Sequence, residues 1–340
     1  MGLQISDIIP KKEIEISDLK GKTLAVDAFN VIYQFLSTIR QPDGTPLQDS
    51  KGRVTSHISG LFYRNINLLQ EGIKLIYVFD GEHPKLKRAT QEKRQESKDE
   101  AIERYEEAKS REDVEAMGKY SRQIVYLDKE KIEESKKLLE AMGIAVIQAP
   151  GEGEAQASYI SKNEDSVYAI ASQDYDCLLF QAPRLIQNLT LAKKRKTVSG
   201  YVEIKPLLMN LKEILTELEI SQEQLICIGI LCGTDYNPGG VKGIGPKKAL
   251  KLVKEHKTGE KIFEALAQDL KYKVEFDWRE IFELMQNPSI DKNYKIEFGK
   301  FDFARVKEIL QEFEFSDERI ESQFQKIREL HEQKKQRTLF

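Results

Sequence analysis

Short, nearly continuous apolar runs recur along the chain and predict strands that are buried on both faces of a sheet. Apolar and polar residues would alternate if one face were exposed to water. Amphipathic segments with the spacing of helices separate these runs. We predict strands at residues 22–26, 74–79, 144–148, 167–171 and 185–189, and helices at 54–70, 129–142 and 154–162. This alternation predicts an α/β fold with a mostly parallel, twisted sheet, flanked by helices and joined by right-handed crossovers.

Acidic residues follow four of the five predicted strands. They are Asp27, Asp80, Glu152, Glu154, Asp174 and Asp176. The carboxyl ends of parallel strands meet at one edge of a sheet, where ligands bind in this class of fold. The two-residue spacing of Asp174 and Asp176 lets both side chains face the same side. We therefore expect six carboxylates at one edge, with Asp235 in the later, helical part of the chain as a seventh candidate.

Carboxylates gathered in this way repel one another unless cations neutralise them. Oxygen ligands without a nearby histidine favour Mg²⁺ or Mn²⁺ over zinc. Two such ions roughly 4 Å apart are a common arrangement for cleaving a phosphodiester. Taken singly, each acid is better interpreted as a surface carboxylate or a helix cap, and Glu152 and Glu154 could simply complement a helix N-terminus. Six acids at one sheet edge favour a metal site.

A highly charged segment from about residue 83 to about residue 127 interrupts the alternation of strands and helices. Its composition favours helix, and Pro84 stands where a helix would start. Its first part is rich in basic residues, namely Lys85, Lys87, Arg88, Lys93, Arg94 and Lys98. On composition alone, an exposed helical hairpin with salt-bridged faces is the simpler interpretation. Its position directly after the strand that leads to Asp80 favours a role beside the acidic edge.

The chain beyond residue 201 is mostly helical, with helices predicted at 207–217, 222–231 and 246–256. Between the last two lies a turn with Gly243 and Gly245, after which Pro246 starts a helix. Such a turn offers backbone N–H groups to a phosphate, and Lys247 and Lys248 add positive charge. A short Gly-x-Gly is most often only a loop. The preceding Leu-Cys-Gly-Thr-Asp-Tyr sequence makes the binding interpretation much stronger.

The 340 residues carry a net charge of −3, which at first argues against a nucleic-acid partner. Setting aside the seven candidate ligands leaves +4 on the rest of the chain, so the charge balance permits DNA binding.

Cys177, Cys227 and Cys232 lie in apolar runs, so we expect buried free thiols in a reducing, intracellular compartment. No apolar run approaches the length of a membrane span, and the N-terminus lacks the layout of a signal peptide. We therefore expect no membrane partner.

Six short motifs are together highly specific: Val26-Asp27-Ala28, Tyr77-Val78-Phe79-Asp80-Gly81, Ala149-Pro150-Gly151-Glu152-Gly153-Glu154-Ala155, Ser172-Gln173-Asp174-Tyr175-Asp176, Gly233-Thr234-Asp235-Tyr236 and Gly243-Ile244-Gly245. Through them, the chain resembles the archaeal flap endonucleases of the structure-specific 5′ nuclease superfamily over essentially its whole length. The resemblance implies a flap endonuclease with 5′–3′ exonuclease activity. Its expected roles are DNA replication, including Okazaki fragment maturation, and repair in the archaeal cytoplasm or nucleoid.

The same resemblance implies a metal centre and a helical arch. Two Mg²⁺ ions, for which Mn²⁺ can substitute, would be held directly or through water by Asp27, Asp80, Glu152, Glu154, Asp174, Asp176 and Asp235. The charged segment at about 83–127 would form the arch through or under which the 5′ single strand passes. Lys87 and Arg94 match basic arch residues that contact the scissile phosphate, and they are our candidate catalytic residues.

DNA contacts are implied at several further places. Gly2 would lie near the site once Met1 is removed, Tyr33 would stack on a base, and Arg40 belongs to a wedge region at 40–55 that bends the junction. A helix–two-turn–helix at about 222–256 would grip the downstream duplex, often with K⁺ bound by its carbonyls. Its candidate DNA-binding residues are Lys242, Gly243, Gly245, Lys247 and Lys248.

The C-terminal end of the chain departs from the family pattern. Family members end in a sliding-clamp motif with a glutamine, a hydrophobic residue three positions later, and then two aromatics. Gln336, Leu339 and Phe340 match part of this motif, so either the tail is clipped or the clamp contact is abbreviated. The simpler interpretation of this segment is a frayed terminus. We expect one nuclease domain at 1–326, a charged tail or helix end at 327–340, and a protein that is a monomer on its own.

Three other interpretations stay open. A sister nuclease would cut bubbles or four-way junctions, but the compact chain and the single arch-sized insertion favour the flap enzyme. A non-catalytic replication adaptor would bind DNA and the clamp without needing seven mutually repelling acids. An RNA-cleaving nuclease with a related sheet would explain the acids but not the glycine turn.

Overall fold

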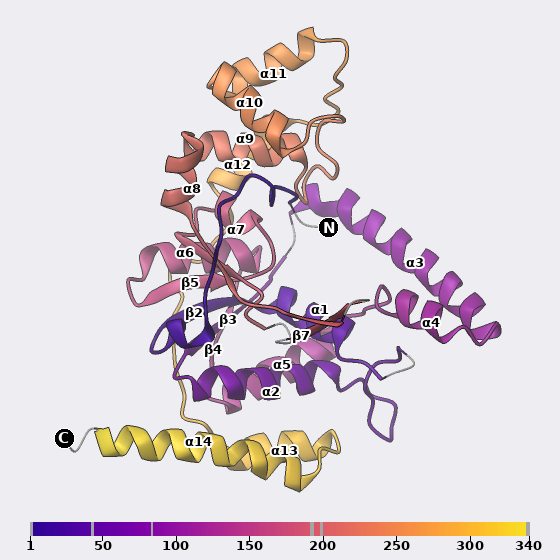
Figure 1. Ribbon diagram of the computed structural model, residues 1–340, viewed down its shortest axis with the longest axis vertical. Coiled ribbons are helices and arrows are strands. Elements are labelled where there is room, and N and C mark those ends of the chain that lie inside the picture. Colours follow the sequence, from indigo (N-terminus) through magenta and orange to yellow (C-terminus); the bar gives the residue numbers. More distant parts are fainter. Residues whose placement is uncertain (1–2, 42–43, 83, 191–193, 198–199, 338–340) are drawn as a thin grey trace.

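The computed structural model describes residues 3–41, 44–82, 84–190, 194–197 and 200–337. Within these ranges a seven-stranded sheet has the order β1-β9-β6-β5-β2-β3-β4 (Figure 1). Its strands are β1 (Lys12–Glu13), β2 (Thr23–Asp27), β3 (Lys74–Phe79), β4 (Ala145–Gln148), β5 (Val167–Ala171), β6 (Arg184–Gln187) and β9 (Leu207–Asn210). A separate antiparallel hairpin consists of β7 (Lys194–Thr197) and β8 (Gly200–Glu203).

The five strands that the sequence predicts form the parallel part of the sheet. Strand β2 pairs in parallel with β3 and with β5, β3 pairs with β4, and β5 pairs with β6. The prediction of an α/β fold with a mostly parallel sheet is confirmed. Because these strands run in one direction, their carboxyl ends share one edge.

The prediction of a helix at 207–217 is wrong for its first turn. Residues Leu207–Asn210 form strand β9, which pairs antiparallel with β6, and helix α8 occupies Leu211–Leu218. The Asn210 side chain accepts hydrogen bonds from the backbone N–H groups of Lys212 and Glu213, which caps the helix. The apolar run before Asn210 is short enough to form either a helix or a strand. It forms a strand because it pairs with β6.

Helices cover both faces of the sheet (Figure 1). On one face lie α1 (Ala28–Thr38), α2 (Ser56–Gln70) and α5 (Lys129–Ala141), and on the other lie α6 (Gly153–Asn163), α7 (Asp176–Leu179) and α9 (Gln222–Cys232). Leu24 and Val26 enter the first core, whereas Ala25 enters the second. Strand β2 is therefore apolar at successive positions because both of its faces are buried.

The charged insertion is helical, as predicted. A short 3₁₀ turn (Lys85–Lys87) leads into α3 (Arg88–Ser110), which is followed by α4 (Val114–Ser121). Helix α3 projects away from the body of the molecule, and α4 lies against its far end (Figure 1). His83, where we expected the insertion to begin, lies outside the described residues. The first turns of α3 lie beside the carboxyl edge of the sheet, because Thr90 and Arg94 line one cavity with Asp27.

The remaining helices lie at the two ends of the molecule (Figure 1). Helices α10 (Pro246–His256), α11 (Gly259–Gln268) and α12 (Trp278–Gln286) join α9 at one end. At the other end, α13 (Phe303–Glu312) lies beside α5 and α14 (Asp317–Arg337) lies beside α2. None of the described helices is both long enough and apolar enough to cross a membrane. Cys177 and Cys227 are buried free thiols, as predicted, and Cys232 is partly exposed.

Helix α14 continues without a break through residue 327, where we expected the tail to begin. Ile320, Phe324 and Ile327 recur at helical spacing and are buried. The described part of the predicted tail is therefore the second half of a helix that is anchored to the fold. The division of the chain into a domain at 1–326 and a tail stays a prediction.

Candidate active site

The carboxyl edge of the sheet brings together the acids that the sequence singled out. Asp27 is the last residue of β2, and Asp80 directly follows β3. Glu152 immediately precedes α6, and Glu154 lies in the first turn of that helix. Asp174 and Asp176 follow β5, with Asp176 opening α7. The predicted location of these six carboxylates is thus the observed one.

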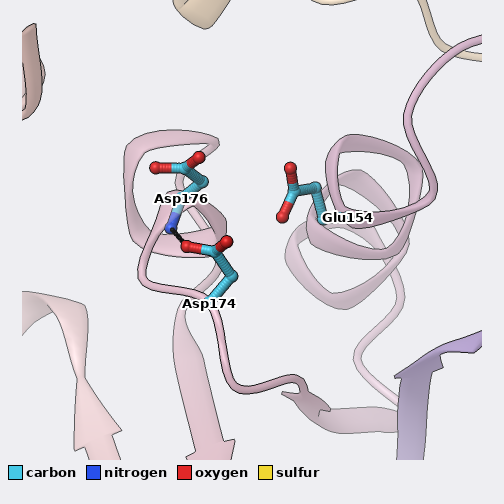
Figure 2. Close-up of side chains that lie close together, drawn as sticks. All are labelled: Glu154, Asp174 and Asp176. Carbon is cyan, nitrogen blue, oxygen red and sulfur yellow. Dashed lines mark hydrogen bonds between the residues drawn. The ribbon is translucent and has the colours of Figure 1, made fainter. Parts of the chain in front are cut away.

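Glu154, Asp174 and Asp176 form the tightest group. Each offers a carboxylate oxygen, and these atoms lie within 4.8 Å of one another. Figure 2 shows the three side chains close together, and the backbone N–H of Asp176 donates to Asp174 Oδ1 at 3.2 Å. Asp176 is 1% exposed, and its Oδ1 has no hydrogen-bond partner among the described residues. A buried, unpartnered carboxylate oxygen beside two other acids fits a divalent cation.

The electrostatics of this group also fit a cation. Burial, together with the nearby Asp80, raises the pKa of Asp27 to about 7. Burial raises the pKa of Glu154 and of Asp176 well above their ordinary values, and it raises the pKa of Asp174 as well. The ionised forms are therefore disfavoured when only protein surrounds them. A bound divalent ion would reverse this penalty.

Asp27 and Asp80 are held by hydrogen bonds from neighbouring elements. Asp27 caps α1 by accepting from the Asn30 N–H at 3.0 Å, and it also accepts from the Ser172 hydroxyl at 3.1 Å. Asp80 Oδ1 accepts from the Gly153 N–H at 2.9 Å. A Cβ atom at position 153 would lie 2.5 Å from that same oxygen, so glycine is required for this contact.

Lys87, at the base of the insertion, supplies positive charge to the acids. Its ammonium group is in ion-pair contact with Glu152 and lies 3.8 Å from Glu154 Oε1 and 3.6 Å from Asp235 Oδ2. Burial opposes its charge, but the surrounding carboxylates, with Glu154 and Asp235 the strongest, together outweigh burial and raise the pKa of Lys87. The Glu152 side chain makes no capping hydrogen bond to α6. Glu152 is at the N-terminus of α6, as the alternative interpretation has it, but its side chain pairs with Lys87 and does not cap the helix.

Arg94 and Thr90 join the first turns of α3 to Asp235. Arg94 Nη2 donates to both carboxylate oxygens of Asp235, at 2.8 and 2.6 Å, and the Thr90 hydroxyl donates to the Asp235 carbonyl. Asp235 also adds to the field that raises the pKa values of Asp174 and Asp176. The seventh acid thus lies between the acid group and the basic residues of the insertion.

Two adjoining cavities open beside these residues. One of about 380 Å³ is lined by Asp27, Asp80, Glu154 and Asp174, and one of about 750 Å³ is lined by Lys93, Lys98 and Arg122. Tyr33, Arg94 and Asp235 line both. The Tyr33 ring is 39% exposed, so an aromatic face is available in the space between α1 and α3.

The other predicted DNA-binding residues lie away from the acids. Arg40 is half-buried, and its guanidinium donates to the backbone carbonyls of Ser37 and Gly44 at 3.2 and 2.9 Å. The glycine turn lies between α9 and α10, as predicted, and Gly243 there has a φ of 83°. Of the candidate contacts in this element, Lys242, Gly243, Gly245 and Lys247 are exposed and Lys248 is half-buried.

Four predicted contacts cannot be placed at a site. Gly2, Leu339 and Phe340 lie outside the described residues, and Gln336 lies in the last turn of α14. Conversely, the sequence interpretation missed Ser172 and Thr90. Ser172 could have been suspected, because it stands between the end of β5 and two acids. Thr90 gave no signal, because its partner is 145 residues away.

Comparison with known proteins agrees with this arrangement. The XPG N-terminal domain model matches residues 3–101, and the XPG I-region model matches residues 143–235. The fold and the acid cluster therefore define a nuclease of the XPG class. Flap endonuclease 1 of Pyrococcus furiosus is 50% identical over 342 residues, covering 100% of this chain and 98% of that protein. The chain belongs to the flap endonuclease 1 family.

Two further similarities support that assignment. Flap endonuclease 1 of Hyperthermus butylicus is 48% identical, covering 97% of this chain and 95% of that protein. The solved structure of flap endonuclease-1 from Methanococcus jannaschii has a TM-score of 0.75 and 41% identity, covering 98% of this chain and all of that one. The catalytic core of Rad2 in complex with DNA, at 22% identity and a TM-score of 0.71, shares the fold.

Proposed function

We propose that the protein is a Mg²⁺-dependent flap endonuclease that also has 5′–3′ exonuclease activity. It would hydrolyse a phosphodiester at the base of a 5′ flap and leave a 5′-phosphate and a 3′-hydroxyl. The observation that carries this proposal is the partly buried group of Glu154, Asp174 and Asp176, which lies beside a cavity lined by basic residues of α3. Membership of the flap endonuclease 1 family supports it.

The acids at the sheet edge would hold two Mg²⁺ ions, with Mn²⁺ as a substitute. The ligand set, direct or through water, is Asp27, Asp80, Glu152, Glu154, Asp174, Asp176 and Asp235. When bound there, the ions supply a nucleophilic water and positive charge for the leaving oxygen. Ser172 and Gly153 keep two of the carboxylates in place through the hydrogen bonds to Asp27 and Asp80. Oxygen ligands of this kind suit hard cations.

Lys87 and Arg94 would act on the phosphate itself. Both already point their charged groups toward the acid cluster, where each is paired with carboxylates. With ions and DNA bound, phosphate oxygens would take over part of this pairing. A guanidinium and an ammonium group fixed beside the scissile phosphate stabilise charge that develops in the transition state.

The substrate would be recognised by shape and backbone rather than by base sequence. The cavity of about 750 Å³ between α1 and the base of α3 has the size and the basic lining to take single-stranded DNA. Tyr33 offers a ring on which any base can stack. The glycine turn, with Lys242, Gly243, Gly245, Lys247 and Lys248, would bind the duplex backbone, and K⁺ would be held by its carbonyls.

Several wider expectations complete the proposal. The protein would act in replication and repair inside the cell, as a monomer on its own, and its C-terminal end at Gln336, Leu339 and Phe340 would contact a sliding clamp. Gly2 would lie near the acids, and Arg40 would support the bend of the DNA junction through the wedge region at 40–55.

A substrate panel tests the proposal. Labelled 5′-flap, bubble, four-way-junction and plain duplex DNA would be compared at enzyme concentrations far below the DNA concentration. We expect metal-dependent turnover that is fastest on the flap and depends little on its sequence. Preferred cutting of bubbles or four-way junctions would point to a sister nuclease, and tight binding without turnover would point to an adaptor.

A further inference from the structure

The first turn of helix α10 concentrates positive charge where a helix does not favour it. Helix N-termini carry a partial positive charge, so cations there are destabilising and acids stabilising. The first turn of α10 contains Lys247 and Lys248 and has no acidic residue. Lys242 is exposed in the turn just before it. An anion bound there would balance this charge.

The side chain of Lys248, unlike those of Lys242 and Lys247, is held in position by a contact with another of the described residues. Its ammonium group donates a hydrogen bond to the Tyr272 hydroxyl and lies 4.6 Å from the centroid of that ring. Lys247 and Lys242 are exposed, whereas Lys248 is half-buried. Within the described residues, the contacts of the Lys248 ammonium are with Tyr272 and include no ion pair with a carboxylate. The Tyr272 hydroxyl thus holds the ammonium without neutralising it.

Tyr272 is itself anchored. It lies in the segment between α11 and α12, where Tyr272, Val274 and Phe276 pack against the core and the residues between them are exposed. Its backbone N–H donates to the Asp269 carbonyl at 2.9 Å. Tyr272 therefore forms a fixed support for a side chain that would otherwise sample many rotamers.

We infer that Tyr272 is a positioning residue that holds the Lys248 ammonium ready for a phosphate of duplex DNA. An ammonium group has three N–H donors, and the Tyr272 hydroxyl uses one of them. The other two remain for phosphate oxygens. This inference rests on the proposed function, because it assumes that the glycine turn and the start of α10 bind the DNA backbone.

Equilibrium binding of labelled double-flap DNA tests the inference. All variants carry Asp174→Ala, so that the DNA is not cut during the measurement. The set is Lys248→Ala, Tyr272→Phe and the double variant. Tyr272→Phe keeps the ring and removes only the hydroxyl, so the fold is expected to be kept. Tyr294→Phe is the matched control, because that hydroxyl donates to Glu164 at 2.8 Å, outside the helix–two-turn–helix.

We expect Tyr272→Phe to raise the Kd about three- to tenfold, the usual effect of losing one hydrogen bond. The salt dependence of binding should stay unchanged, because the charge of Lys248 remains. Lys248→Ala should lower the slope of log K against log salt concentration by about one. In the Lys248→Ala background, Tyr272→Phe should have no further effect. With Asp174 restored, Tyr272→Phe should raise KM and leave kcat unchanged.

An unchanged Kd for Tyr272→Phe would overturn the inference. So would an equal loss in both backgrounds, because Tyr272 would then act independently of Lys248. If Lys248→Ala left both the Kd and the salt slope unchanged, Lys248 would not contact a phosphate of the duplex. The inference would then also be wrong. Failure of the nuclease proposal is a different result, namely no metal-dependent cutting by the unsubstituted protein.

Discussion

Arg94 and Asp235 are joined by two hydrogen bonds from a single guanidinium nitrogen, at 2.8 and 2.6 Å, although 141 residues separate them. Arg94 lies near the base of the projecting helix α3, and Asp235 lies in the loop that leads to the glycine turn. Together with Thr90, this pair connects the helical insertion to the element proposed to bind duplex DNA. The acid cluster lies beside this connection.

Replacement of Arg94 should affect the chemical step more than binding. We expect Arg94→Ala to lower the single-turnover rate about 10²- to 10³-fold, because a fixed donor to the phosphate is lost. Arg88→Ala is the control, since that side chain is 83% exposed on the same helix and pairs only with Glu92 among the described residues. Equal effects of the two substitutions on the rate would contradict a specific role for Arg94.

Mg²⁺ should stabilise the fold, because it relieves repulsion among buried carboxylates. At a concentration one hundred times its Kd, a ligand that binds only the folded state contributes about 2.7 kcal/mol. We expect a rise in the thermal midpoint when Mg²⁺ replaces chelator, and a smaller rise in Asp176→Asn. Asp165→Asn, an exposed aspartate between α6 and β5, should respond like the unsubstituted protein. A full response of Asp176→Asn would remove that residue from the metal site.

Without metal, Asp27 should make stability depend on pH. Its folded pKa is about 7 and its ordinary value is 3.8, so the folded state binds the proton more tightly. The metal-free protein therefore loses stability from this group as the pH rises from about 4 to about 7. In chelator, Asp27→Asn should be more stable relative to the unsubstituted protein at pH 8 than at pH 5, by a few kcal/mol. Urea unfolding at both pH values measures this difference. A difference that does not change with pH would show that ionisation of Asp27 does not destabilise the folded state.

Tyr33 should contribute through its ring. Stacking on a base is worth about 1–3 kcal/mol when measured by alanine substitution. We expect Tyr33→Ala to weaken flap DNA binding by about tenfold, and Tyr33→Phe to bind as the unsubstituted protein does. Titration of a labelled flap substrate measures both. A Tyr33→Phe variant as weak as Tyr33→Ala would show that the hydroxyl, rather than the ring, makes the contact.

The strands and the position of the acids could be predicted because both follow from local rules. Continuous apolar runs indicate doubly covered strands, and the direction of parallel strands places Asp27, Asp80 and Asp174 at one edge. The helical insertion could likewise be predicted, since its composition hardly permits any other structure.

Other features depended on contacts that no local rule contains. Strand β9 is a strand because β6 offers an edge, and the same four residues would also suit a helix. The ion pairs of Lys87 with Glu152 and of Arg94 with Asp235, and the support of Lys248 by Tyr272, join side chains distant in sequence. The sequence indicated that these lysines and arginines supply positive charge near the site. It did not indicate which side chain each of them contacts.

Cleavage of a labelled double-flap DNA by the unsubstituted protein and by Asp174→Ala, each in Mg²⁺ and in chelator, tests the central claim most directly. We predict one cut at the base of the flap by the unsubstituted protein in Mg²⁺, and no cut in the other three reactions. Asp174→Ala should still bind the DNA. Cutting that survives chelator, or that persists in Asp174→Ala, would contradict the claim that the acids at the sheet edge hold the catalytic metal ions.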